Sequence, residues 1–94
     1  MITEGYRYKF VEGVALREAE NTLLLSLLAA EGLYGEARVR MDAGYAVDAA
    51  LRVIVVDGAT PVGQDVCNIF TAFITKEFGP RSFCVHPLEQ EVQA

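Results

Sequence analysis

The segment from Val53 to Val66, VIVVDGATPVGQDV, has the residue order of a phosphate-binding loop: β-branched residues, a glycine-rich turn and the start of a helix. Gly58 and Gly63 have the G-x-x-x-x-G spacing of such a loop. A working phosphate loop continues with Lys, which reaches the phosphates, and with Ser or Thr, which holds Mg²⁺. Here Gln64 and Asp65 follow Gly63, so we interpret the segment as a strand leading into a helix rather than a nucleotide site.

Cys84 and His86 form the other arrangement that could do chemistry. They lie two positions apart in a short segment expected to be a strand, so both side chains point to the same face. Such side chains are about 7 Å apart, and no third group is evident that would orient the imidazole for a nucleophilic thiol. Cys67 lies in an apolar helical segment and is expected to be a core residue. We therefore expect a non-catalytic protein that uses no cofactor.

The composition argues against several kinds of site and partner. One histidine and two cysteines cannot supply the four sulfur and imidazole ligands of a structural zinc site, so no metal is predicted. A net charge of −5 argues against a general nucleic-acid-binding protein, because affinity for phosphate backbones comes from clustered Lys and Arg. The N-terminus MITEGYRYKF lacks the apolar core of a secretory signal, and no apolar stretch approaches the roughly 20 residues of a membrane span. We expect a cytoplasmic protein without a membrane partner.

Hydrophobic periodicity predicts four strands and two helices in one domain over residues 1–94, with an ordered core of about 5–87 and a flexible tail over 88–94. The expected elements are a strand over 6–11, a helix over about 15–33, a strand over 37–48, a strand over 51–57, a helix capped by Thr60 and stopped by Gly79, and a strand over 82–87. The first helix is expected to bury an apolar stripe made of Leu16, Ala19, Leu23, Leu27, Ala30 and Tyr34, widened by Leu24 and Leu28.

The order β-α-β-β-α-β is the split βαβ, or ferredoxin-like, pattern of α+β proteins. It predicts a four-stranded antiparallel sheet in the order 4-1-3-2, with two helices on one face and the other face open. Alternation along the strands places the aromatic residues under the helices. The residues expected on the open face are five of the eight cations and two aliphatic residues beside Cys84 and His86: Arg7, Lys9, Arg38, Arg40, Arg52, Ile54 and Val56.

Three interpretations of this basic face compete. Its cations could be ordinary solvated side chains. The face could bind a protein partner, and a second copy of the chain would cover Ile54 and Val56. It could also bind RNA or another anion, although the segment RVIVVDG lacks the aromatic residues on which bases stack.

The turns after the first and third strands are a further candidate site. If these two strands are parallel neighbours, the turns meet at one end of the sheet; they contain Glu12, Gly13, Asp57, Gly58 and Thr60. Their carboxylates suit helix capping and compensation of the helix dipoles, or alternatively an amine-bearing ligand or a hard cation such as Mg²⁺. We expect an association or regulatory module that binds a second copy or another protein through the open sheet face. The alternative is a small-ligand or anion-binding module at this end of the sheet or on the basic face.

Overall fold

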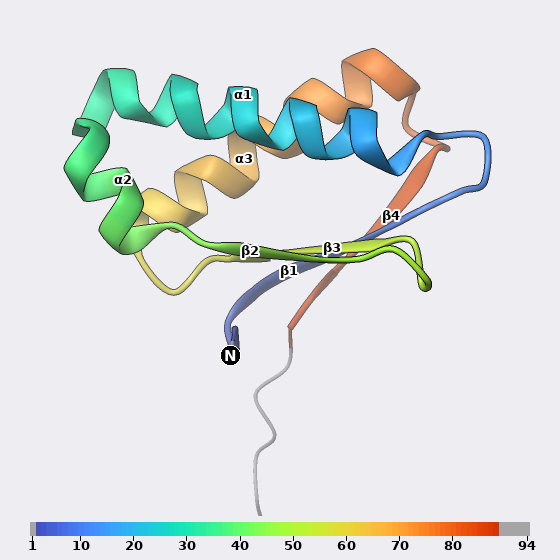
Figure 1. Ribbon diagram of the computed structural model, residues 1–94, viewed down its shortest axis with the longest axis horizontal. Coiled ribbons are helices and arrows are strands. Elements are labelled where there is room, and N and C mark those ends of the chain that lie inside the picture. The colour runs from blue at the N-terminus through green and yellow to red at the C-terminus, as the bar shows by residue number, and fades with distance from the viewer. Residues whose placement is uncertain (1, 89–94) are drawn as a thin grey trace, which may run out of the picture.

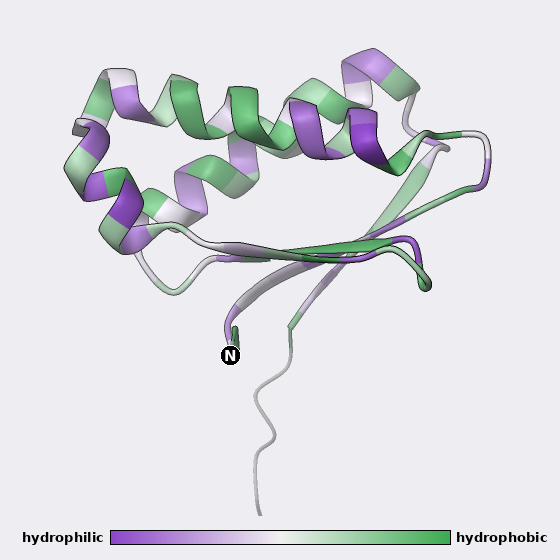
Figure 2. Cartoon of the chain, viewed as in Figure 1, coloured by the Kyte–Doolittle hydropathy of each residue, from purple (hydrophilic) through white to green (hydrophobic). Residues whose placement is uncertain are grey.

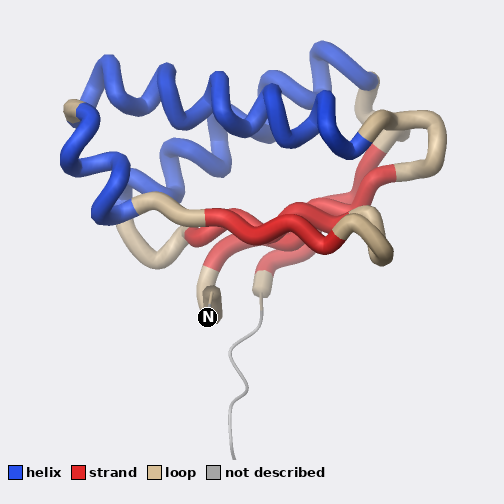
Figure 3. The backbone as a smooth tube through the Cα atoms, in the orientation of Figure 1, coloured by secondary structure: helices blue, strands red, loops and turns tan. Residues whose placement is uncertain are grey.

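A four-stranded antiparallel sheet carries three helices on one of its faces (Figure 1), which makes the protein an α+β fold. The computed structural model describes residues 2–88. The elements, in chain order, are β1 (Gly5–Phe10), α1 (Leu16–Tyr34), α2 (Glu36–Asp42), β2 (Tyr45–Asp48), β3 (Val53–Asp57), α3 (Pro61–Phe78) and β4 (Phe83–Pro87). The opposite face of the sheet carries no helix in the part of the chain that the structure describes (Figure 3).

The strands lie in the order β2-β3-β1-β4, which reads 4-1-3-2 when counted from the β4 edge. Every neighbouring pair is antiparallel, including β1 with β3. The expectation that β1 and β3 are parallel was therefore wrong. Gly5 pairs with Asp57 and Lys9 pairs with Val53, so the C-terminal ends of the neighbouring strands β1 and β3 point to opposite ends of the sheet.

The segment expected to be one long strand over 37–48 is a helix followed by a short strand. In α2, Glu36 and Arg40 form one ion pair over 3.6 Å, and Arg38 and Asp42 form another over 3.0 Å, each between residues four apart. Such pairs stabilise helices, and only Val39 on this helix is buried. The alternation of apolar and charged residues had suggested a strand, but it also allows a helix that contacts the core through one side chain.

Three of the four ends of the two long helices carry the capping residues that are typical of helix ends. Thr60 caps α3, Pro61 occupies its first turn and Gly79 ends it with a positive φ of 92°. Gly35 ends α1 in the same way, with a φ of 86°. The start of α1 at Leu16 has no side-chain cap.

The turn between β2 and β3 places Arg52 at a positive φ of 57°, which is uncommon for a residue with a side chain. Its guanidinium donates hydrogen bonds to three carbonyl oxygens where β1 leads into α1: Phe10 at 3.4 Å, Val11 at 2.7 Å, and Val14. The Phe10 amide in turn donates to the Arg52 carbonyl over 3.0 Å. Arg52 therefore links the β2–β3 hairpin to the segment between β1 and α1. Its side chain is not on the open face of the sheet.

The core lies between the sheet and the helices. The ring of Tyr8 meets that of Phe70 from α3 edge-on, with centroids 4.8 Å apart, and both side chains are fully buried. Tyr8 pairs with Ile54 in the sheet, and Tyr6 pairs with Val56, so these aliphatic residues point toward the helices with the tyrosines. The prediction that Ile54 and Val56 face outward was wrong. Val53 and Val55 take the outward positions instead, since side chains alternate along β3.

The end of the described chain stays attached to the sheet, because the Leu88 amide donates to the Gly5 carbonyl over 2.8 Å. The rest of the predicted flexible tail, residues 89–94, lies outside the described residues. Within residues 2–88, no helix has both the length and the apolar character that are needed to cross a membrane.

Candidate functional site

The open face of the sheet is much less basic than expected. Of the five cations assigned to it, only Arg7 and Lys9 lie there. Their neighbours across the strands are Val55, Val53, Cys84 and His86. Arg38 and Arg40 belong to α2, where each pairs with a carboxylate on the same helix, and Arg52 binds backbone carbonyls. The structure therefore does not gather the cations into one anion-binding surface.

Cys84 and His86 do share the open face, as predicted, and both side chains are exposed. Lys9 is the cross-strand partner of Cys84, and Arg7 is that of His86. No hydrogen bond joins Cys84 to His86 within residues 2–88. Cys67 is buried in α3, and burial raises the pKa of its thiol from 9.0 to about 11, so it is a protonated core residue at neutral pH. No group of three or more potential metal ligands is found in the described residues.

The two turns proposed as a joint site are separated by the length of the sheet, because β1 and β3 are antiparallel. Glu12 and Gly13 lie near the end of β1, while the loop with Asp57, Gly58 and Thr60 lies near its start. The structure does not bring these residues together. A single site formed by both turns, for an anion or for a cation, is therefore excluded by the strand directions.

The loop after β3 uses its polar groups inside the protein. The Asp57 side chain accepts from the Ala59 amide over 2.9 Å, and the Gln64 side chain donates to the Gly58 carbonyl over 2.8 Å. A Cβ atom on Gly63 would lie 2.4 Å from the Asp57 carbonyl oxygen. Gly63 is therefore required by the close approach of the loop backbone to the first turn of α3. A Cβ atom on Gly58 would lie 2.8 Å from Nε2 of Gln64 and 3.0 Å from the Cα atom of Gly5, so this position is crowded as well.

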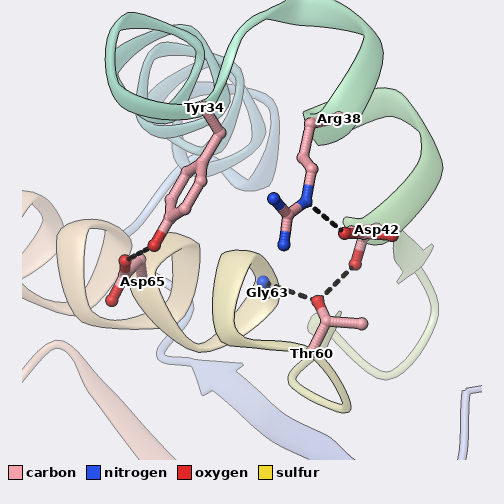
Figure 4. A network of polar contacts seen from close by, with 6 residues as sticks. All are labelled: Tyr34, Arg38, Asp42, Thr60, Gly63 and Asp65. Carbon is pink, nitrogen blue, oxygen red and sulfur yellow. Dashed lines mark hydrogen bonds and ion pairs between the residues drawn. The ribbon is translucent and has the colours of Figure 1, made fainter.

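Thr60 is the centre of this loop (Figure 4). Its hydroxyl accepts from the Gly63 amide over 3.0 Å and donates to the Asp42 carbonyl at the end of α2 over 2.8 Å. Nearby, the Tyr34 hydroxyl donates to the Asp65 carboxylate, and the Arg38 guanidinium lies 5.7 Å from the centre of the Tyr34 ring (Figure 4). The bond to Asp65 raises the pKa of Tyr34, because a phenol that donates to a carboxylate retains its proton. This network joins the three helices to one another.

The outward side of α1 carries exposed apolar side chains that the sequence did not lead us to expect there. Its exposed side chains include three leucines, with exposed fractions of 46% for Leu24, 58% for Leu25 and 61% for Leu28. Leu33 is also exposed, but it lies half a turn around the helix from Leu24. Figure 2 shows α1 as hydrophobic along much of its length. Leu25 also lines a shallow hollow of about 360 Å³ with Phe73 of α3, which is 39% exposed. We call Leu24, Leu25, Leu28 and Phe73 the leucine surface.

Leu24 and Leu28 had been assigned to the buried stripe, and that assignment was wrong. The buried stripe consists of Ala19, Leu23 and Ala30, with Leu16, Leu27 and Tyr34 packed against its sides. The run LLLSLLAAEGL is apolar around the whole circumference of the helix, and one sheet can cover only one side of it. This run was the sequence signal for a second, outward apolar side.

Comparisons of the chain with models of protein families, with curated proteins and with solved structures found no match.

Proposed function

We propose that the protein is a non-catalytic association module that forms a homodimer through the leucine surface. The exposed leucines of α1 are the observation that supports this proposal. A helix that is apolar on all sides is typically buried on all sides, and a contiguous exposed apolar area is typical of an interaction surface. Fully burying a leucine side chain is favourable by about 1.5–3 kcal/mol, and these side chains are about half exposed or more.

The open sheet face supports association less well. Its apolar part consists of Val53, which is already buried, Val55, which is partly buried, and the small side chain of Ala46, which pairs with Val55. Ile54 and Val56, which gave that face its apolar centre in the sequence-based prediction, are covered by the helices. The outward side of α1 therefore replaces the sheet as the proposed interface.

The charges along α1 favour a second copy of the chain as the partner. Arg17, Asn21, Leu24, Leu28 and Glu31 recur at alternating intervals of four and three, so they form one stripe along the helix. If two α1 helices pack antiparallel about a twofold axis near Leu24, Arg17 of each copy lies opposite Glu31 of the other, since Leu24 is midway between them. Neither side chain has an ion-pair partner within residues 2–88, and such reciprocal contacts are what a twofold interface requires.

We also propose that the topology is the ferredoxin-like split βαβ. The strand order supports it, as does the order of elements when α2 is taken as an additional helix in the connection between α1 and β2. In this arrangement the side of α1 that faces away from the sheet is exposed, and it can meet another molecule there.

The test is the molar mass of the full chain in solution, measured by sedimentation equilibrium at about 50 µM, a concentration at which a micromolar dimer is populated. We expect the mass of two chains for the unaltered protein and that of one chain for Leu28→Lys. The matched control is Leu51→Lys, because Leu51 is also an exposed leucine, 52% exposed, but lies in the β2–β3 turn. A single-chain mass for the unaltered protein, or equal dissociation by both variants, would contradict the proposal.

A further inference from the structure

A groove of about 520 Å³ lies between α3 and the sheet, apart from every surface that the sequence pointed to. Its sheet side is formed by Tyr6 and Tyr8 of β1 and Val85 of β4. These residues are on the helix-facing side of their strands, at the place where α3 leaves the β4 edge partly uncovered. The volume is within the range of about 300–1,000 Å³ that is typical of small-molecule sites.

The helix side of the groove is formed by polar and small residues of α3. Asn68, Thr71, Ala72 and Thr75 are spaced so that they share one side of the helix. Among residues 2–88, none of those that line the groove is an acid or a base with a charge at neutral pH. A charged ligand group would therefore lose hydration here without gaining an ionic partner, which favours a neutral ligand.

The hydroxyl protons in the groove are already engaged by the protein. The hydroxyl oxygens of Tyr8 and Thr71 are 2.8 Å apart, and both reach the Cys67 carbonyl, at 3.2 Å and 2.8 Å respectively. Two protons serve these contacts, one between the hydroxyls and one toward the carbonyl. The Thr75 hydroxyl donates to the Thr71 carbonyl over 2.6 Å. Toward a ligand, Thr71 and Thr75 can therefore offer only the free acceptor sites on their oxygens.

Asn68 supplies the free hydrogen-bond donor that these hydroxyls lack. Its side chain is exposed and makes no hydrogen bond with any residue in the described range 2–88. An asparagine amide presents a donor and an acceptor side by side, which matches the donor and acceptor pair on the edge of an adenine base. Tyr6 adds an aromatic surface in the same groove, on which a flat ring can stack.

From this geometry we infer that the groove binds a neutral purine-type heterocycle, as the free base or its nucleoside. Asn68 would pair with the donor and acceptor edge of the base, Tyr6 would contact the face of the ring, and the Thr71 and Thr75 oxygens would accept from further N–H or O–H groups of the ligand. The inference goes beyond the proposed dimer. The groove and the leucine surface share no residue, so the ligand-binding inference and the dimer proposal can be tested separately, and one can be wrong while the other holds.

The experiment uses the full ¹⁵N-labelled chain and adenosine at about 1 mM, where even a site of millimolar affinity is half occupied. We expect amide shifts at Asn68, Thr71, Ala72 and Thr75 and none at Leu25 or Leu28. Asn68→Ala should weaken binding about tenfold, the cost of losing about two hydrogen bonds. The control is Arg81→Ala, which truncates an exposed polar side chain in the turn after α3, outside both the groove and the leucine surface, and it should bind as the unaltered protein does.

Three outcomes would overturn the inference. The first is the absence of shifts at the groove amides. The second is equal binding by Asn68→Ala and the unaltered protein. The third is binding of indole as tightly as adenosine, because indole has a flat ring but no neighbouring donor and acceptor. Unchanged adenosine binding by Leu28→Lys, whatever its mass, would support the inference and show that the groove does not depend on the dimer.

Discussion

The Thr60 hydroxyl donates a hydrogen bond to the Asp42 carbonyl oxygen over 2.8 Å, and this contact links the end of α2 to the start of α3. The same hydroxyl caps α3 by accepting from the Gly63 amide. One side chain thereby satisfies a free donor at one helix end and a free acceptor at another. α2 is short and buries only Val39, so it depends on such contacts for its position.

We expect Thr60→Ala to lower the free energy of unfolding by about 1–2 kcal/mol, because it removes both a cap and a second hydrogen bond. Thr60→Ser keeps the hydroxyl and should recover most of this loss. Urea denaturation followed by circular dichroism measures both variants. Equal destabilisation by serine and alanine would show that the methyl group, rather than the hydroxyl, is what matters.

Two glycines within helices should respond to alanine in opposite directions. A Cβ atom at Gly32 of α1 would meet nothing within 4 Å, so Gly32→Ala should raise the free energy of unfolding by about 0.5–1 kcal/mol through helix propensity. At Gly63 the same atom would lie 2.4 Å from a backbone oxygen, and Gly63→Ala should lower that free energy by about 1–3 kcal/mol. Thermal denaturation of the pair is the measurement. A stabilising Gly63→Ala would contradict the close contact between the loop and α3.

Stability should decrease in alkaline solution. Burial raises the pKa of Cys67 from 9.0 to about 11, and burial also raises the pKa of Tyr8 above its ordinary 10.0. Each group releases its proton at a lower pH in the unfolded chain than in the folded one. The contribution of these two groups to the free energy of unfolding is therefore complete below about pH 9, and it decreases as the pH rises through the folded pKa values.

The measurement is the free energy of unfolding from urea titrations at about pH 8, 9 and 10. Cys67→Ala should show a smaller decrease between pH 9 and 10 than the unaltered protein does. Cys84→Ala, which removes the exposed thiol, serves as the control and should keep the original decrease. Identical pH profiles for all three proteins would refute the role of the buried thiol.

Charge reversal tests the orientation of the proposed dimer. Arg17→Glu should weaken dimerisation about threefold to tenfold, because each copy would then place a glutamate opposite Glu31 of the other. Arg17→Glu combined with Glu31→Arg should restore the affinity to within about twofold of the original. Sedimentation equilibrium gives the three dissociation constants. A double variant no better than the single one would exclude the antiparallel arrangement of α1, even if the protein is a dimer.

The parts of the fold that could be predicted from the sequence have strong local causes. Thr60 and Gly79 mark the ends of α3 because a cap and a left-handed stop each involve only neighbouring residues. The buried side of α1 follows from apolar residues at intervals of three and four, a spacing that is typical of helices and not of strands. Likewise Tyr8 and Phe10 point inward, because a clear alternation leaves one choice for β1.

The parts that could not be predicted depend on contacts between distant segments. The apolar run of β3 has no alternation, so either Ile54 or Val55 could have faced the helices until pairing with Tyr8 fixed the register. The order of charged and apolar residues along α2 fits a strand and a helix equally well. The burial of Val39 with Met41 left 83% exposed, and the ion pairs between residues four apart, distinguish the two. Because four of the seven residues expected on the open face, Arg38, Arg40, Ile54 and Val56, lie in these two segments, most of the predicted basic face was lost with them.

The Arg52 side chain has a consequence for how the molecule opens to solvent. One guanidinium group bonds to carbonyls on both sides of the corner between β1 and α1, while its own backbone belongs to the β2–β3 hairpin. Neither region can separate from the other while these bonds persist. Amide protons in the hairpin and at that corner should therefore exchange with water in a single concerted event, although the two regions are far apart along the chain.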